Sequence, residues 1–179
     1  IITGHSYGLG AALAAAWLET GACVIGLARS NNAALAATHP GQLHETAIDL
    51  ADPQAVLAYT RSDAFRHICQ EADTLWLFNN AGTVAPSAPL GAQADDDITH
   101  ALNLNITAPL LLANATVAHA RDRERVRIVH ISSGAARKPY PGWSIYGASK
   151  AALTAMPPTL PPSEFLMVSI RLIGPLRHA

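Results

Sequence analysis

A phenol and an ammonium group stand one helical turn apart at Tyr146 and Lys150, in the run Tyr-Gly-Ala-Ser-Lys. On a helix, residues with this spacing face the same side. A tyrosine hydroxyl ordinarily ionises near pH ~10, so alone it is a poor proton donor or acceptor at neutral pH. A cation about 4 Å away favours the phenolate by up to ~4 kcal/mol at an effective dielectric constant of ~20. The pair therefore predicts acid–base chemistry at Tyr146.

A hydroxyl group that could act beside this pair belongs to Ser133, which ends an apolar run. At that position it could bind the oxygen of a substrate carbonyl. The Tyr-x-x-x-Lys spacing alone arises often by chance, so its weight comes from the motifs that precede it. These are a glycine-rich loop at 3–10 and the run Asn-Asn-Ala-Gly at 79–82.

The glycine-rich loop, Thr-Gly-His-Ser-Tyr-Gly-Leu-Gly, stands between a strand end and a helix. Its glycines allow a tight turn and a close approach of the backbone to a pyrophosphate, and the helix N-terminus supplies free N–H groups. The residues predicted to contact a nucleotide are Gly4, Ser6, Tyr7, Gly8, Leu9 and Gly10. An ordinary strand-to-helix turn is the alternative, because the spacing G-x-x-x-G-x-G differs from the usual dinucleotide fingerprint.

The end of the second predicted strand indicates which nucleotide the loop would hold. Ala28 stands where an acidic residue often binds the ribose 2′-hydroxyl, and Arg29 follows it. Without a carboxylate nothing repels a 2′-phosphate, and a guanidinium can pair with it. The sequence therefore predicts NADP as the cofactor, with NAD as the alternative. In the competing interpretation Arg29 is a solvated loop residue.

Strands and helices alternate along the chain and predict where these motifs lie. Apolar runs predict strands at 23–28, 44–48, 74–78 and 127–131. Helices are expected at 9–19, from Asp52-Pro53 onward, at 63–70, at 98–120 behind an acidic trio with a break near Pro109, and at 146–154. The alternation predicts an α/β fold, a Rossmann-like doubly wound parallel sheet flanked by helices.

The composition of the chain argues against several classes of partner and site. The chain has 179 residues, with 12 Lys plus Arg against 13 Asp plus Glu, and a net charge of −1, which argues against a nucleic-acid partner. No apolar run approaches the ~20 residues of a bilayer span, so no membrane partner is expected. Two cysteines are too few for a disulfide framework, so a cytoplasmic location is expected. One of them, Cys23, stands in an apolar run and is expected in the core. Without His-Glu-x-x-His or paired cysteines, no metal site is expected.

In their order along the chain, the motifs at 3–10, 79–82, Ser133 and Tyr146 with Lys150 resemble those of the short-chain dehydrogenase/reductase family. The resemblance runs from residue 1 to about 153, and the 13 positions between Ser133 and Tyr146 fit the family. It implies that Tyr146 is the general acid–base. It also implies that Lys150 binds the nicotinamide ribose and favours ionisation of Tyr146, and that Ser133 steadies the substrate carbonyl.

The resemblance implies further site residues. Asn105 would complete a proton relay, Asp49 would lie near the adenine ring, and Asn79 would help to hold the sheet and the cofactor. Ala81 and Gly82 also belong to the predicted cofactor site. Several short sequence motifs are also similar to those of the branch of the family around sepiapterin and benzil reductases.

These motifs imply an NADP(H)-dependent oxidoreductase that transfers a hydride between nicotinamide and a small-molecule carbonyl or alcohol. The remaining alternative is a non-catalytic nucleotide-binding domain or an inactive truncated reductase.

The end of the chain departs from the family pattern. Two proline pairs, at 157–158 and 161–162, cannot lie inside a regular helix, so the helix of Lys150 is expected to stop near Ala155 or Met156. Residues 1–153 are predicted as the nucleotide-binding domain. Residues 154–179 are predicted as an irregular tail of the same domain, with a strand at 167–173.

The start of the chain also departs from the family pattern, because only Ile1 and Ile2 precede the glycine loop. Together with the departure after Lys150, this predicts a sheet that is truncated at both ends. Members of the family usually pair through the helix of Asn105 and the helix that follows the catalytic lysine. Because prolines interrupt the second of these, the chain is expected to be monomeric or aggregation-prone.

Overall fold

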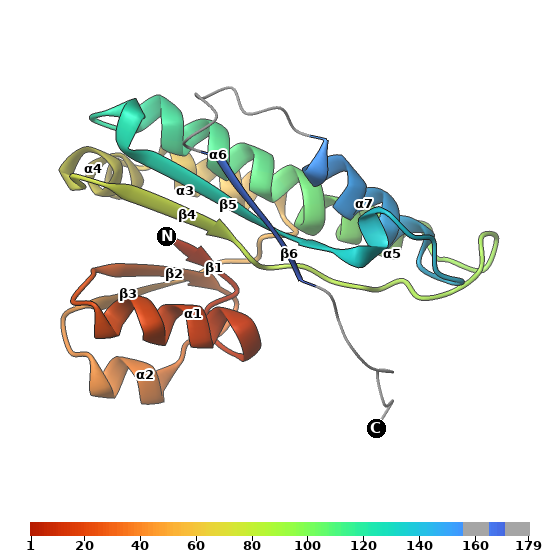
Figure 1. Cartoon of the computed structure of the whole chain (residues 1–179), viewed down its shortest axis with the longest axis horizontal. Helices are drawn as coiled ribbons and strands as arrows, with labels where there is room; N and C mark the ends of the chain where they lie inside the picture. Colours follow the sequence, from red (N-terminus) through yellow and green to blue (C-terminus); the bar gives the residue numbers. More distant parts are fainter. Residues whose placement is uncertain (156–164, 171–179) are drawn as a thin grey trace.

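Six parallel strands form one sheet in the order β3-β2-β1-β4-β5-β6 (Figure 1). The computed structural model describes residues 1–155 and the strand at 165–170. The strands are β1 (Ile2–Thr3), β2 (Val24–Ala28), β3 (Leu43–Ala47), β4 (Leu75–Asn79), β5 (Val126–Ser133) and β6 (Phe165–Ile170). The strand order reverses at β1, so the predicted doubly wound α/β sheet is confirmed.

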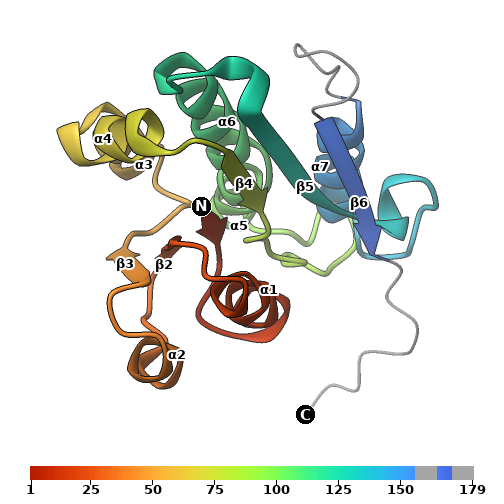
Figure 2. The same cartoon turned by 60° about the vertical axis from the view of Figure 1, so that its left-hand side comes forward.

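Helices cover both faces of the sheet. The first two lie on one face and α3 to α7 lie on the other, as the two views agree (Figures 1 and 2). The α-helices are α1 (Gly8–Glu19), α2 (Ala33–Thr38), α3 (Pro53–Arg61), α4 (Asp63–Glu71), α5 (Asp95–Leu102), α6 (Ala108–His119) and α7 (Ser144–Thr154). A π-helical turn, η1 (Asn103–Thr107), joins α5 to α6, and two 3-10 turns are η2 (Arg123–Arg125) and η3 (Gly134–Ala136).

Helix starts follow the capping residues of the sequence. Asp52 accepts the backbone N–H of Gln54 at 2.8 Å, and Pro53 opens α3. Ser62 accepts the N–H of Phe65 at 3.1 Å and so separates α3 from α4. The predicted helices at Asp52-Pro53 and 63–70 are therefore confirmed.

Each face of the sheet has its own apolar core. Beneath α3, α4 and α6 the fully buried side chains include Phe65, Leu77 and Leu112. Beneath α1, Trp17 packs against Trp76 with ring centroids 5.3 Å apart. These layers fix the strands and hence the positions of the loops that follow them.

The structure corrects two expectations and confirms a third. Cys23 is exposed, because β2 begins one residue later and Cys23 lies at the amino edge of the sheet; its assignment to the core was wrong. The last strand is at Phe165–Ile170 rather than 167–173, and residues 171–173 lie outside the described residues. Helix α7 ends at Thr154 with Ala155 as its cap, as predicted, whereas the proline pairs lie outside the described residues.

One stretch in the described part of the chain, Asp95–His119, is long and apolar enough to cross a membrane by length and composition alone. The expectation that no stretch reaches this length was therefore wrong for the helix taken as a whole. A core helix passes the same test, and this one packs against α3, α4, α7 and the strands. It therefore forms part of the helical layer on this face of the sheet.

Candidate functional site

A cavity of about 360 Å³ lies at the carboxyl ends of β1 to β4, where open parallel sheets bind their ligands. Its lining contains every predicted cofactor residue except Asn79 and Lys150: Gly4, Ser6, Tyr7, Gly8, Leu9, Gly10, Arg29, Asp49, Ala81 and Gly82. It also contains residues that the sequence analysis did not single out, among them Ser30, Asn80, Thr83, His100 and Leu104.

The glycine loop is held against β4 by Asn80. The Asn80 side-chain amide donates to the carbonyls of Thr3 at 2.9 Å and Gly4 at 3.3 Å, and its backbone N–H donates to Thr3 Oγ1 at 2.9 Å. A Cβ on Gly10 would overlap the Gly4 carbonyl, so only glycine lets α1 begin this close to the loop. Only the neighbouring Asn79 was predicted from the sequence as a cofactor residue. The signal that was missed is the second amide of the doublet after the strand.

Asn79 itself lies in the core and does not line the cavity. Its side-chain amide donates to the carbonyl of Pro109 at 3.4 Å and lies 3.3 Å from His130 Nδ1. Asn79 thus joins β4 to α6 and β5. Burial, and secondarily the charge of Lys150, lower the pKa of His130 from 6.5 to about 4.

Acid is expected to destabilise the protein through His130. The folded-state pKa of about 4 lies below the ordinary value of 6.5, so the unfolded state binds more protons between these values. The free energy of unfolding should be highest above the upper value and fall by up to about 3 kcal/mol as the pH drops through this window. Urea unfolding at a series of pH values measures the slope.

Two variants separate this contribution from that of other groups. His130→Leu should lose most of the slope between the two pKa values, because it removes the buried titrating group. His67→Leu, at an exposed position of α4, should keep the slope. Equal slopes in all three proteins would contradict the assignment to His130.

The predicted break at Pro109 takes the form of the π-helical turn η1. Pro109 has no N–H to donate to the carbonyl of Asn105. The helix does not end there but widens into a π-helical turn over Asn103–Thr107. The Asn105 side chain is buried; it accepts the N–H of Thr83 at 2.8 Å and donates to the Thr83 carbonyl at 2.8 Å. Asn105 therefore holds the segment that follows β4.

The same amide connects this segment to α7. Asn105 Nδ2 donates to Ser149 Oγ at 3.0 Å, and Ser149 Oγ donates to the carbonyl of Tyr146 at 2.8 Å. The edge of the cavity at Thr83 is thus tied to the helix that carries Tyr146 and Lys150. Asn105 was predicted from the sequence as a site residue, whereas Thr83 and Ser149 were not.

Ser133 and Tyr146 lie on adjoining elements. Ser133 ends β5, is 5% exposed, and accepts the N–H of Ala135 at 3.2 Å. Helix α7 packs closely on η3, since a Cβ on Gly147 would lie 3.1 Å from the Ala135 carbonyl. Tyr146 is 7% exposed, and its ring meets that of Trp143 edge to face at 5.5 Å.

Lys150 is a buried cation between Tyr146 and the cavity. Its Nζ donates to the Ile131 carbonyl at 2.8 Å and lies 5.8 Å from the centroid of the Tyr146 ring. A Cβ on Gly82, which lines the cavity, would be 3.4 Å from the same Nζ. Burial lowers the pKa of Lys150 from 10.5 to about 8. The arrangement places a positive charge at the cavity edge, next to a phenol.

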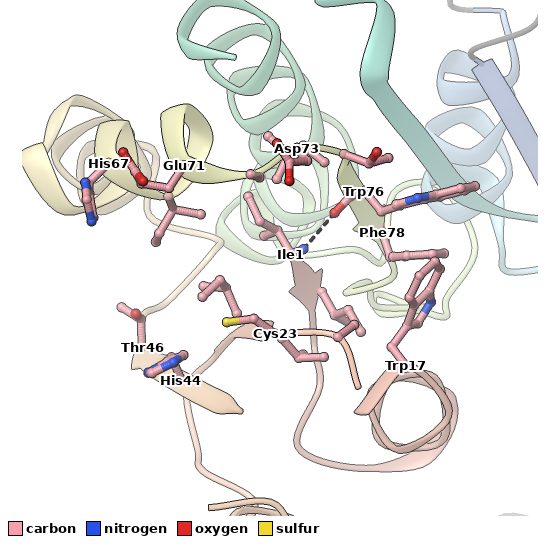
Figure 3. Close-up of a pocket in the computed structure, with 18 of the residues that line it drawn as sticks. Ile1, Trp17, Cys23, His44, Thr46, His67, Glu71, Asp73, Trp76 and Phe78 are labelled. Atoms are coloured by element: carbon pink, nitrogen blue, oxygen red, sulfur yellow. Dashed lines mark hydrogen bonds between the residues drawn. The ribbon is translucent and has the colours of Figure 1, made fainter. Parts of the chain in front are cut away.

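A larger cavity of about 960 Å³ lies at the opposite, amino edge of the sheet (Figure 3). Apolar side chains such as Trp17 and Phe78 line much of it, and the Ile1 ammonium donates to the Trp76 carbonyl at 2.7 Å. Its lining includes no predicted site residue. Ligands of parallel α/β sheets bind at the carboxyl ends, so the smaller cavity is the candidate site.

The chain is similar to known proteins over most of its length. A family model described as short chain dehydrogenase matches residues 1–162. The benzil reductase ((S)-benzoin forming) of Bacillus subtilis (strain 168) is 37% identical over 159 residues, which are 86% of this chain and 62% of the reductase. The chain thus spans less than two thirds of the length of this curated relative.

Solved structures share the fold. A short-chain dehydrogenase/reductase from Burkholderia vietnamiensis is 40% identical with a TM-score of 0.84, over 95% of this chain and 80% of its own. A metagenomic short-chain oxidoreductase in complex with NADP is 26% identical with a TM-score of 0.80, over 95% of this chain and 78% of its own.

Proposed function

The chain belongs to the short-chain dehydrogenase/reductase family, and from this premise we propose that it is an NADP(H)-dependent oxidoreductase acting on a carbonyl/alcohol pair. The observation that carries the proposal is the position of the Lys150 ammonium between Tyr146 and the cavity edge at Gly82. Such a cation can bind the hydroxyls of a nicotinamide ribose while it lies beside the ring of the proposed proton donor. The close-packed glycines of the loop fit a pyrophosphate at the other end of the cavity.

The bound cofactor supplies or accepts the hydride, and the residues of this chain handle the oxygen and the proton. In the direction of reduction, Ser133 donates a hydrogen bond to the carbonyl oxygen and orients it. Tyr146 gives its proton to the same oxygen as the carbon becomes that of an alcohol. Lys150 stabilises the phenolate that Tyr146 leaves behind. Asn105 holds the segment after β4 in register with α7 and supports the proton relay.

An apolar, aromatic carbonyl compound is the substrate class that the surroundings favour. The ring of Tyr140 packs against that of Trp143 in a tilted arrangement, with centroids 5.3 Å apart, and Trp143 in turn meets Tyr146 edge to face, so a row of aromatic rings leads to the phenol. Aromatic faces of this kind bind flat apolar groups. The name of the Bacillus subtilis relative, a benzil reductase, agrees with this class.

The direct test is turnover of NADPH with a panel of carbonyl compounds. The panel contains benzil, smaller aromatic ketones and short aliphatic aldehydes, and cofactor oxidation is followed by absorbance. We expect the aromatic diketone to be reduced fastest. Binding of NADPH without turnover of any carbonyl would overturn the proposal and leave a nucleotide-binding domain.

NADPH is expected to bind more tightly than NADH because Arg29 lies on the cavity lining and Ala28 offers no carboxylate. Arg29→Asp removes the guanidinium and adds repulsion toward a 2′-phosphate. A charge-assisted hydrogen bond contributes about 1.5–3 kcal/mol, so the Kd for NADPH should rise at least about 10-fold. The Kd for NADH should change by less than about 3-fold.

Fluorescence titration with each cofactor measures both constants. Arg137→Asp makes the same charge change at an exposed position outside the cavity lining, and it should leave the ratio of the two constants unchanged. Equal affinities of the unmodified protein for NADPH and NADH would count against the assignment.

A further inference from the structure

A partly buried carboxylate connects two loops that line the cavity, although the carboxylate itself does not line it. Glu45 lies on β3, and its side chain is 10% exposed. Glu45 Oε1 accepts a hydrogen bond from His5 Nε2 at 2.7 Å and from the backbone N–H of Asn32 at 2.6 Å. His5 belongs to the glycine loop, whereas Asn32 ends the segment between β2 and α2.

The imidazole of His5 is set firmly between these elements. The ring is fully buried against Gly26 of β2, where a Cβ would lie 2.5 Å from its atoms. Burial alone would raise the pKa of Glu45, but the N–H groups of Asn32 and His5 hold it below its usual range. The contact is therefore a charge-assisted one, which is stronger than a bond between neutral groups.

Two more hydrogen bonds depend on the distance between the glycine loop and the segment that follows β2. The Asn32 side-chain amide donates to the carbonyl of Ser6 at 3.3 Å, and Ser30 Oγ donates to Ser6 Oγ at 3.1 Å. Ser6, Arg29 and Ser30 all line the cavity. Residues 29–32 follow β2, at the point where the adenosine ribose of a dinucleotide lies in folds of this kind.

We infer that Glu45, acting through His5 and Asn32, is a positioning residue that sets the distance between the glycine loop and residues 29–32 and thereby selects NADPH over NADH. The inference rests on the proposed function. Glu45 lies outside the cavity lining, so it acts on the cofactor only by holding Arg29 and Ser30 where a 2′-phosphate would meet them. Both cofactors carry the same pyrophosphate and nicotinamide, so a change that reaches only these groups would alter the two Kd values alike and leave their ratio unchanged.

Titration of both cofactors against Glu45→Ala and Glu45→Gln tests the inference. Glu45→Ala should raise the Kd for NADPH at least about 10-fold and that for NADH less than about 3-fold. Glu45→Gln keeps an acceptor oxygen but not the charge, so an intermediate rise of about 3-fold is expected for NADPH alone. In turnover, the effect should fall on the KM for NADPH rather than on kcat. Glu71→Ala, a carboxylate removed at the other edge of the sheet, should change neither constant.

The outcomes separate the two proposals. If the unmodified protein binds neither cofactor, the proposed function fails. If it prefers NADPH and the folded Glu45→Ala variant changes both constants by one factor, or neither, only the inference on Glu45 is overturned. Should Glu45→Ala not fold, an unchanged Kd of Glu45→Gln for NADPH overturns it equally.

Discussion

Replacing Tyr146 by phenylalanine is expected to lower kcat for carbonyl reduction by at least about 1,000-fold, because the variant has no proton to give to the carbonyl oxygen. NADPH binding should change little, since Tyr146 does not line the cavity at the carboxyl ends of the strands. The phenyl ring of the variant would keep the edge-to-face contact with Trp143, so the packing of α7 is preserved. Steady-state kinetics at saturating cofactor, with NADPH titration beside it, measure both quantities.

Tyr59→Phe is the matched control. It removes the same hydroxyl group from a half-buried ring on α3 that meets Phe65 edge to face at 5.3 Å and lines neither cavity. Its turnover should remain within about 2-fold of the unmodified protein, because no proton transfer passes through it. If Tyr146→Phe kept more than a tenth of the original turnover, another group would have to be the acid.

Lys150→Met is expected to abolish turnover and to stabilise the fold at the same time. The folded-state pKa of about 8 lies below the ordinary 10.5, so burying the charged form costs about 3 kcal/mol at neutral pH. Methionine has nearly the same length and no charge, although it forgoes the hydrogen bond to the Ile131 carbonyl, about 1 kcal/mol. The net gain in the free energy of unfolding should be about 2 kcal/mol, with a loss of at least 100-fold in kcat.

The pH dependence identifies the cause of the gain. Between pH 8 and 10.5 the unfolded state binds more protons than the folded state, so the penalty on Lys150 is released as the pH rises through this window. The advantage of Lys150→Met, measured by denaturant unfolding, should therefore be full below the window and shrink across it. Lys138→Met, at the chain's other lysine, is exposed and should show neither effect. A destabilised Lys150→Met variant would contradict this account.

The sheet could be predicted from the sequence because each of its central strands is a short apolar run. The run at 74–78 forms β4 with a shift of one residue, and the run at 127–131 lies within the longer β5. Cys23 was misplaced because an apolar run does not tell where it crosses the edge of the sheet. The π-helical turn was also missed, since Pro109 indicates only that a regular α-helix cannot continue unchanged.

Site residues close together along the chain were easier to predict than those that meet across it. The glycine loop and the pair Tyr146–Lys150 are short-range patterns, and the loop residues line the cavity. Asn80 meets Thr3 only because β1 and β4 are neighbours in the sheet. The pairing of Glu45 with His5 likewise depends on the β2–β3 register, which hydrophobic periodicity does not specify.

The π-helical turn makes the long helix at 95–119 equivalent to a regular α-helix with one inserted residue. An insertion absorbed within one turn leaves the helical phase on either side unchanged. The buried faces of α5 and α6 therefore do not depend on the extra residue. The position of Asn105, which is hydrogen-bonded to Thr83, does depend on it. The amide that braces the segment after β4 can therefore be positioned at this turn without a change in the apolar core beneath α6.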